Sequence, residues 1–154
     1  MDILDELKKL ISKLNVENIE YALCGGMAMA IYAFPRATLD IDLLVEASSL
    51  EATRRAVSDL GFTVKAAPME FHGGKMHIHR VSKIEPGTGE TLVLDLLIVT
   101  PAIKSAWDSR KKVEWEHGHI SAVSPGGLIL LKSFRKSGQD QDDIRFLRSI
   151  IDED

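Results

Sequence analysis

The chain has 154 residues, of which 45% are hydrophobic and 27% charged, and its formal net charge is −4 at pH 7. This length and composition are typical of one folded domain with a sizeable core, and they exclude a disordered chain. The acidic balance argues against a protein that holds nucleic acid by bulk electrostatics, but it is compatible with a local basic groove.

Targeting signals and crosslinks are missing from the sequence. Its apolar runs are shorter than the roughly 18 residues that cross a membrane, and Asp2 and Asp5 stand where a signal peptide carries basic residues. The single cysteine, Cys24, excludes an internal disulfide, and its place at the end of an apolar strand favours a small buried side chain over a reactive thiol. We therefore expect a cytoplasmic, soluble protein with no membrane contact.

Helix and strand patterns alternate along the chain. Apolar residues at helical spacing predict a first helix over 2–15. The strands expected after it lie at 20–24, 39–45, 62–66, 76–82 and 91–100, with a hairpin of 112–117 and 120–123 that turns at Gly118. The helices expected after it lie at 27–32, 48–60, 101–107, 124–137 and 141–151, and 67–75 is expected to be a loop. This order predicts a mixed α/β domain (α+β in some schemes) over residues 1–154, with a core at about 1–123 and a C-terminal helical pair at about 124–154.

Two carboxylates are expected on one face of the strand at 39–45. Residues two apart on a strand share a face, with Cα atoms roughly 6.5–7 Å apart, so Asp40 and Asp42 point the same way. They repel each other unless a cation lies between them, and a divalent ion with oxygen ligands is the usual solution. The pair Gly25 and Gly26, before the helix at 27–32, offers backbone N–H groups to a phosphate. These features together suggest a metal–triphosphate site.

Asp95 is isolated within LVLDLLIV, a run that is apolar on both faces and typical of a central strand. A lone carboxylate is costly to bury there without a partner. One explanation is a bond to backbone N–H groups or to a nearby arginine. The other is that this strand lies beside the one that carries Asp40 and Asp42, so that three carboxylates converge in a site suited to Mg²⁺ bound to phosphates.

Histidines on the strand at 76–82 raise the question of a zinc site. His77 and His79 share one face of that strand, and His72 lies in the preceding loop. No cysteine pair or third ligand with suitable spacing accompanies them. A half-exposed strand face near the substrate cleft is therefore the favoured interpretation.

Taken together, the Gly25-Gly26 pair, the following helix, the run R-x-T-x-D-I-D from Arg36 to Asp42 and the distal Asp95 resemble the nucleotidyltransferase superfamily with the polymerase-β-like fold. Within it, the chain is most similar to small bacterial stand-alone nucleotidyltransferases, including the toxin-like proteins of abortive-infection systems. The resemblance covers residues 21–147. It implies a mixed sheet flanked by helices, with a C-terminal helical pair.

The resemblance also implies roles for individual residues. Asp40 and Asp42 would bind Mg²⁺ or Mn²⁺ ions that bridge the triphosphate of an NTP such as ATP, and Asp95 would complete the second metal site and act as a general base. The remaining residues would contact the nucleotide: Gly25 and Gly26 would hold the phosphates, and Arg36 and Thr38 would touch phosphate or hold the loop.

A second part of the match lies near the C-terminus. Helical spacing predicts that Lys132, Arg135 or Lys136, and Gln139 share one face, and the resemblance implies that Lys132 binds the nucleotide. Toxin-like relatives follow such a helix with a K-D-x-x-D segment, in which Gln139 here replaces the expected basic residue. Asp140 and Asp143, which come next, equally suit a helix cap and first turn.

Three hypotheses remain open at this point. The favoured one is a Mg²⁺-dependent enzyme that moves an NMP from an NTP to a hydroxyl of a tRNA, a protein or a small molecule and releases pyrophosphate. The second is a non-catalytic nucleotide- or partner-binding module, such as one component of a toxin–antitoxin pair or a homodimer. The third is a plain α/β domain in which Asp40 and Asp42 only end a strand and Asp95 lies far from both.

Overall fold

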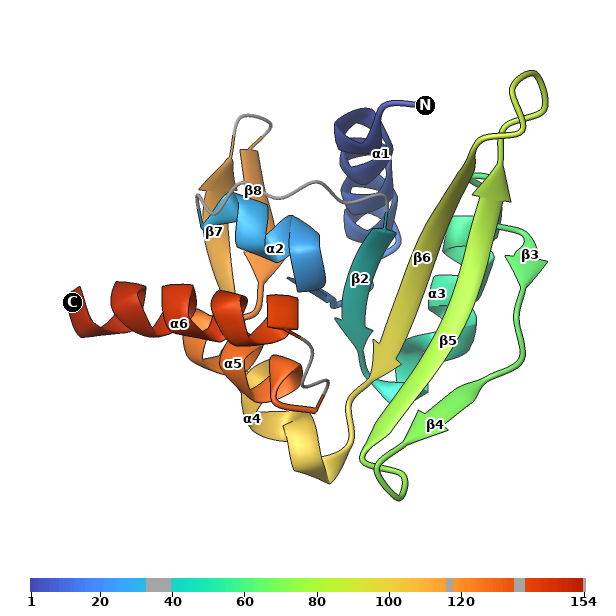
Figure 1. Ribbon diagram of the computed structural model, residues 1–154. Coiled ribbons are helices and arrows are strands. Elements are labelled where there is room, and N and C mark those ends of the chain that lie inside the picture. The colour runs from blue at the N-terminus through green and yellow to red at the C-terminus, as the bar shows by residue number, and fades with distance from the viewer. Residues whose placement is uncertain (33–39, 116–117, 135–137, 154) are drawn as a thin grey trace.

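A computed structural model describes residues 1–32, 40–115, 118–134 and 138–153 (Figure 1). Its strands are β1 (Ala22–Cys24), β2 (Asp40–Val45), β3 (Val64–Lys65), β4 (Met69–Phe71), β5 (Met76–Ile84), β6 (Thr91–Ile98), β7 (Lys111–Trp115) and β8 (Gly118–Ala122). Its α-helices are α1 (Ile3–Val16), α2 (Gly25–Ile31), α3 (Leu50–Ser58), α4 (Lys104–Asp108), α5 (Pro125–Lys132) and α6 (Gly138–Glu153). Short 3-10 turns, η1 (Ala47–Ser49) and η2 (Pro101–Ile103), precede α3 and α4.

All of these strands belong to one mixed sheet in the order β3-β5-β6-β2-β1-β8-β7, with β4 paired to β5. β2 runs parallel to β6 and β1 runs parallel to β8, whereas the other pairs are antiparallel. The predicted mixed α/β class is therefore confirmed. The parallel pairing matters most for the site, because it places the strand of Asp42 directly beside the strand of Asp95.

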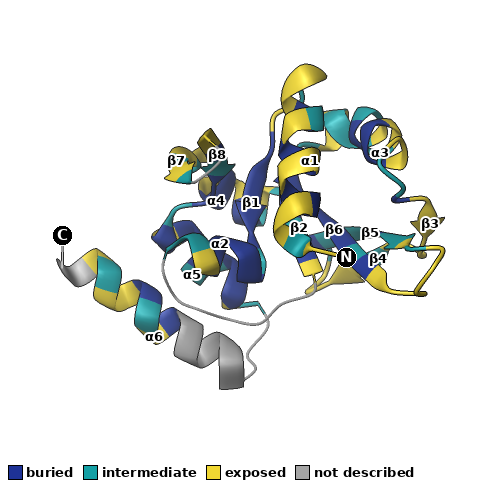
Figure 2. Ribbon diagram, turned by 90° about the horizontal axis from the view of Figure 1, so that it is seen from above, coloured by how far each residue is buried: buried dark blue, intermediate teal, exposed yellow. Residues whose placement is uncertain are grey.

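Helices lie on both sides of this sheet. Figures 1 and 2 show α1 and α3 against one face, and α2, α5 and α6 on the other side. The inner face of α1 buries Leu7, Leu10 and Leu14, and the Asp2 side chain caps its first turn by accepting a hydrogen bond from the Leu4 N–H. The core therefore forms mainly between α1, α3 and the central strands.

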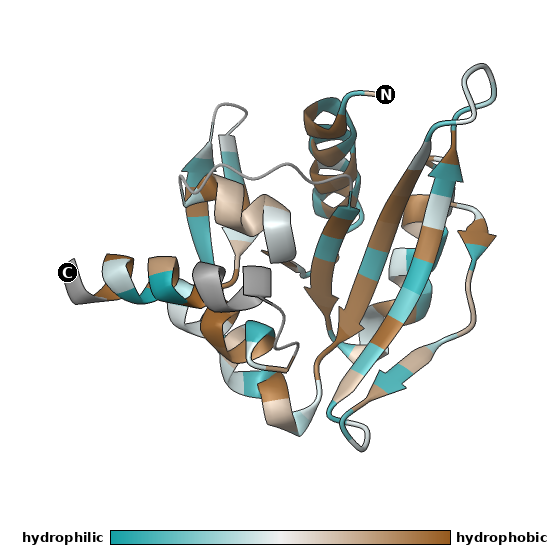
Figure 3. Cartoon of the chain, viewed as in Figure 1, coloured by the Kyte–Doolittle hydropathy of each residue, from teal (hydrophilic) through white to brown (hydrophobic). Residues whose placement is uncertain are grey.

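The central strands are apolar because both of their faces are covered. In β6 every residue from Leu94 to Ile98 is buried, and in β2 the run from Leu43 to Val45 is buried as well. Figure 3 shows β2 and β6 as largely hydrophobic strands interrupted by hydrophilic bands. Asp42 in β2 and Asp95 in β6 interrupt the apolar sequence that is otherwise typical of central strands.

Three segments differ from the sequence-based expectations. Residues 69–71, expected within a loop, form β4, because they find an antiparallel partner in Met76–Ile78 of β5. The strand expected at 62–66 is reduced to β3, since Phe62 turns into the core instead. The helix expected to reach residue 137 ends at Lys132, where the Ser133 side chain donates to the Leu130 carbonyl, and the last helix begins earlier, at Gly138.

Neighbouring glycines at the start of α5 provide a test of this packing. A Cβ on Gly127 would lie 2.7 Å from Ser109 Oγ and 3.2 Å from Ala106 Cα, whereas a Cβ on Gly126 would meet nothing closer than 3.9 Å. We expect Gly127→Ala to lower the free energy of unfolding by about 1–3 kcal/mol, because it overpacks the contact between α4 and α5. Gly126→Ala is the matched control and should be neutral or stabilising by up to about 1 kcal/mol, as alanine favours a helix. Urea denaturation measures both; equal effects of the two substitutions would contradict the packing.

Candidate active site

The carboxylates predicted from the sequence line one cleft, and those of Asp42 and Asp95 form a row across the sheet. Asp42 on β2 is paired in register with Asp95 on β6, and neighbouring strands lie about 4.8 Å apart. Asp40, two residues before Asp42, lines the same cleft. The third hypothesis, in which Asp95 lies far from the other two, is therefore wrong.

These residues lie in a cleft of about 440 Å³ between the sheet and α5, within the usual range for a small-molecule site. One part of its lining is polar and consists of Cys24, Gly25, Asp40, Asp42, His72, Arg80, Asp95 and Lys132. The other part is apolar and consists of Phe71, Met76, Ile78, Leu97, Leu128, Leu131 and Phe134. The lining of the cleft thus combines charged with apolar side chains, as a ligand with phosphates and a flat ring system would require.

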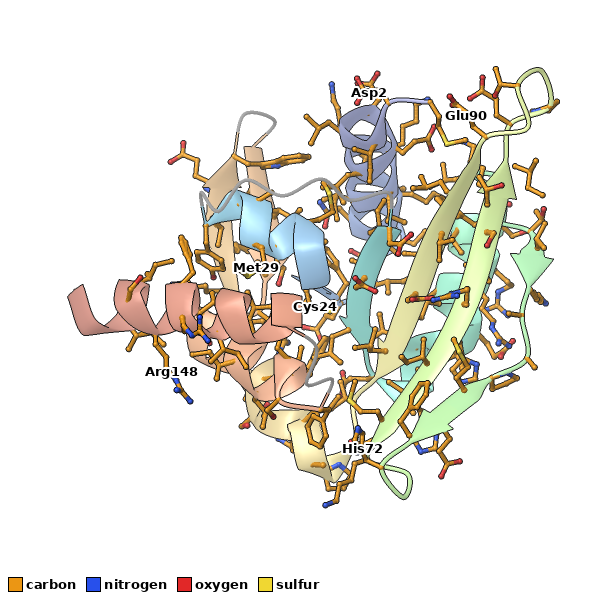
Figure 4. The ribbon with its side chains drawn as sticks, in the orientation of Figure 1. Asp2, Cys24, Met29, His72, Glu90 and Arg148 are labelled. Atoms are coloured by element: carbon orange, nitrogen blue, oxygen red, sulfur yellow. The ribbon has the colours of Figure 1, made fainter. Side chains whose placement is uncertain are left out.

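Asp42 packs directly on the start of α2. Gly25 has a φ of +66°, and a Cβ on it would collide with the Asp42 carboxylate, with Cγ only 2.8 Å away. Figure 4 shows Cys24 between α2 and β2; it is buried and is the backbone partner of Asp42. Gly25 lines the cleft, while Gly26 is buried in the first turn of α2 and is not part of the cleft lining. The close approach explains why a glycine begins the helix here.

Asp95 is held by an arginine that sequence reasoning did not single out. Arg80 on β5 is its register partner, and the guanidinium donates from Nε to Oδ1 at 2.8 Å and from Nη2 to Oδ2 at 3.0 Å. Asp95 therefore has the arginine partner that the first explanation required, and its strand also lies beside that of Asp42, as the second explanation expected. Alternation along β5 was the available signal, because it places Met76, Ile78 and Arg80 on the cleft side.

The donor chemistry of this row suits a hard divalent cation, because all three side chains offer carboxylate oxygens. Within the described parts of the chain, however, no three or more His, Cys, Asp or Glu side chains are gathered closely enough to hold a metal. Asp95 instead directs both oxygens to Arg80. The residues present fit a metal by type and by strand register, and in this arrangement the charge of Asp95 is balanced by Arg80.

Lys132 lies across the cleft from the carboxylates. It is the last residue of α5 and is only 3% exposed, so its ammonium group belongs to the interior of the cleft wall. α5 begins as predicted, with Ser124 accepting from the Gly127 N–H and Pro125 in the first turn. Since this helix ends at Lys132, the expectation that Gln139 shares its face is wrong, because Gln139 belongs to α6.

His72 joins the two walls at one end of the cleft. It has a φ of +53° in the turn between β4 and β5, and its Nε2 is hydrogen-bonded to the carbonyl of Phe134, just after α5. The two rings also pack at a tilt, with centroids 5.3 Å apart. The loop between β4 and β5 thus contributes a side chain to the cleft, as a flap beside the site would.

The other two histidines are not near the cleft, contrary to expectation. The residues of β5 that alternate with the cleft-facing ones point toward α3 and α1. His79 Nδ1 accepts a hydrogen bond from Arg54 Nη2 of α3 at 2.9 Å, and Lys83 pairs with Glu6 of α1. Burial, with the nearby charges of Arg54 and His77, lowers the pKa of His79 below 6.5.

The lowered pKa of His79 predicts how stability depends on pH. The folded state binds a proton on His79 less readily than the unfolded state, so this contribution is present above about pH 6.5 and is lost as the pH falls through the folded-state pKa. We expect the free energy of unfolding to fall between about pH 7.5 and pH 5.5, and to fall less in His79→Gln. Urea unfolding at the two pH values measures this difference; identical losses in both proteins would contradict it.

Several predicted residues cannot be compared with the structure. Arg36 and Thr38 lie outside the described residues, as do the side chains of Gln139, Asp140 and Asp143. The cleft residues that sequence reasoning missed, apart from Arg80, are mainly the apolar ones around Phe71 and Phe134. Their pattern in the sequence is that of ordinary core residues, so only the fold could gather them.

A parallel pair of carboxylate-bearing strands beside a glycine-started helix is the arrangement that the resemblance to polymerase-β-like nucleotidyltransferases implies. Similar solved structures include a putative nucleotidyltransferase from Thermotoga maritima, with a TM-score of 0.61 and 16% identity over 99% of this chain and 94% of that one. They also include ANT(2'')-Ia in complex with adenylyl-2''-tobramycin, with a TM-score of 0.65 and 14% identity over 96% of this chain and 88% of that one. A comparison with curated proteins found no match.

The family itself is established by sequence. Residues 11–133 match the family described as "Nucleotidyl transferase AbiEii toxin, Type IV TA system". Since this match covers most of the chain, the protein belongs to the AbiEii family of nucleotidyl transferase toxins. The predicted enzyme class and the resemblance to abortive-infection proteins are thereby confirmed. Along the described parts of the chain, no helix is both long and apolar enough to span a membrane.

Proposed function

We propose that this protein is a Mg²⁺-dependent nucleotidyltransferase that moves an NMP from an NTP to a hydroxyl group of an acceptor and releases pyrophosphate. The observation that carries the proposal is the register pairing of Asp42 with Asp95 inside a cleft that also contains Asp40 and Lys132. Carboxylates on adjacent strands are mutually repulsive, and a cation-binding role would explain why all three line one cleft. Mn²⁺ would be an alternative metal.

In this reaction an oxygen of the acceptor forms a bond to the α-phosphorus, while the bond from that phosphorus to the oxygen bridging to the β-phosphate breaks. Asp95 would accept the proton of the attacking hydroxyl, and Asp40 and Asp42 would hold the metal together with Asp95. The metal, when bound, neutralises the triphosphate and stabilises the attacking and leaving oxygens. Gly25 is placed to approach a phosphate.

On the opposite wall of the cleft, Lys132 would meet the triphosphate. Its ammonium group is enclosed by the protein, where a charge interacts more strongly than at the surface. Gly26, Arg36 and Thr38 remain proposed nucleotide contacts on the strength of their place in the motif.

The lining of the cleft narrows the class of acceptor. Beyond Asp95 the wall carries Arg80, His72 and the half-exposed Phe71, and within the described residues it adds no further carboxylate. A polycationic small molecule would need additional anionic groups here. An acceptor with planar and neutral or anionic groups, such as the end of a tRNA, fits this lining better than a polycation; a protein side chain is the other candidate.

The test is direct labelling. The protein is incubated with each α-³²P-labelled NTP and Mg²⁺ or Mn²⁺, together with total RNA, total protein or small-molecule extract. We expect label to enter one of these fractions with release of pyrophosphate, and to be absent with Asp95→Asn. Nucleotide binding without label or pyrophosphate in every fraction would overturn the proposal.

That negative outcome would support a second function, a non-catalytic nucleotide- or partner-binding module. The bidentate pairing of Asp95 with Arg80 favours it, since the carboxylate is satisfied without a metal. The toxin–antitoxin assignment of the family supports a protein partner, either an antitoxin or a second copy of the chain.

A further inference from the structure

Arg80 extends the row of acidic residues across a third strand. Asp42, Asp95 and Arg80 occupy successive register positions on β2, β6 and β5. The Arg80 side chain is 41% exposed, whereas that of Asp95 is 9% exposed. The arginine therefore reaches from the open part of the cleft onto a carboxylate that is almost fully enclosed.

The guanidinium is attracted by all three carboxylates and not only by its nearest partner, Asp95. The hydrogen bonds and charge of Asp95 raise the pKa of Arg80, and the charges of Asp40 and Asp42 raise it further. Among the described residues, Lys132 is the other lysine or arginine that lines the cleft, and it belongs to the wall that α5 forms.

This arrangement conflicts with metal binding in a defined way. A fork of two N–H groups engages both oxygens of Asp95 side by side, which is the geometry of a strong arginine–carboxylate pair. A divalent cation bridging Asp42 and Asp95 would compete for the same oxygens and would be repelled by the guanidinium at short range. A bound triphosphate carries the negative charge that can give Arg80 an alternative partner.

We propose that Arg80 is a positioning residue that holds Asp95 while no metal is bound, competes with the divalent ion for that carboxylate, and yields when the NTP arrives. Metal binding is thereby coupled to nucleotide binding, and by linkage each strengthens the other. This inference rests on the proposed function, because it requires the carboxylate row to be the metal site.

The experiment measures Mn²⁺ binding to the full chain without nucleotide, by electron paramagnetic resonance of free Mn²⁺. We expect Arg80→Gln to tighten binding by at least about tenfold, since removal of a neighbouring like charge has effects of this order. Arg80→Lys, which keeps the charge and loses the fork, should be intermediate. Lys112→Gln, an exposed position on β7, is the control for the same change in net charge.

Two further measurements assign the effect to Asp95. In an Asp95→Asn background, Arg80→Gln should no longer change Mn²⁺ affinity. A non-hydrolysable NTP analogue should tighten Mn²⁺ binding more in the wild type than in Arg80→Gln. An unchanged or weaker affinity in Arg80→Gln relative to Lys112→Gln, or the same gain in the Asp95→Asn background, would overturn the inference.

The outcome is separable from that of the labelling experiment because affinity is measured without turnover. Tighter Mn²⁺ binding in Arg80→Gln with no label transferred by the wild type would preserve the role of Arg80 and refute the proposed function. Label transfer by the wild type with unchanged Mn²⁺ affinity in Arg80→Gln would support the proposed function and refute the role of Arg80. If Arg80→Gln is too unstable at room temperature, its melting temperature with and without Mn²⁺ replaces the titration. We expect Mn²⁺ to raise the melting temperature of Arg80→Gln more than that of the wild type. An equal rise in the two proteins would contradict the inference.

Discussion

Asp42→Asn is expected to lower the rate of nucleotidyl transfer by on the order of 10³-fold, because metal-bound carboxylates support several kcal/mol of transition-state stabilisation. The fold should survive this change. Asparagine has nearly the same shape, and it removes one of the negative charges that repel each other in the cleft. Label transfer at saturating NTP measures the rate, and urea denaturation measures the free energy of unfolding.

The control for Asp42→Asn is Asp108→Asn. Asp108 is an exposed carboxylate on α4 in a surface pair with Lys104, so the same chemical change there should leave the rate within about twofold. A rate loss in Asp42→Asn that is matched by Asp108→Asn would point to a general loss of charge. Full activity of Asp42→Asn would contradict the assignment of the metal role.

Gly25→Ala is expected to impair both stability and activity. The substitution forces a side chain into a left-handed conformation, at about 1–2 kcal/mol, and its Cβ would occupy the position of the Asp42 carboxylate. Asp42 must then move away from the row that it forms with Asp95. Since small misplacements of reacting groups are costly, we expect the rate to fall by about 10²-fold or more.

A matched glycine separates the two effects. Gly89, in the connection between β5 and β6, has a φ of +73°, and a Cβ there would meet nothing within 4 Å. Gly89→Ala should therefore show only the conformational cost in urea denaturation and should keep its rate. If Gly25→Ala behaved like Gly89→Ala in both urea denaturation and label transfer, the contact between Gly25 and Asp42 would contribute nothing to activity.

The parts of the fold that the sequence predicted are those with strong local signals. The helical repeat of Leu7, Leu10 and Leu14 and the cap at Ser124 predicted α1 and the start of α5. Short edge strands were predicted less well, because β4 exists only through its pairing with β5. The end of α5 was missed because Lys132 and Ser133, where the helix ends, carry no strong stop signal such as glycine or proline.

The candidate site likewise contains residues that the sequence predicted and residues that it did not. Asp40, Asp42 and Asp95 were predicted because charges within apolar strands need an explanation, and the register confirms that the two strands are neighbours. Arg80 was missed because its role depends on which face of β5 meets the cleft. His77 and His79 were expected to lie on the face of β5 near the cleft, but they lie on its other face.

The pairing of β2 with β6 has a consequence for the timing of activity during synthesis. Asp42 and Asp95 are 53 positions apart (95 − 42), and nothing local brings their strands together. Contacts between distant segments form late, after the entropy of closing the intervening chain has been overcome. A nascent chain therefore has no complete carboxylate row until β6 has left the ribosome and paired with β2, so the site is assembled only when folding is well advanced.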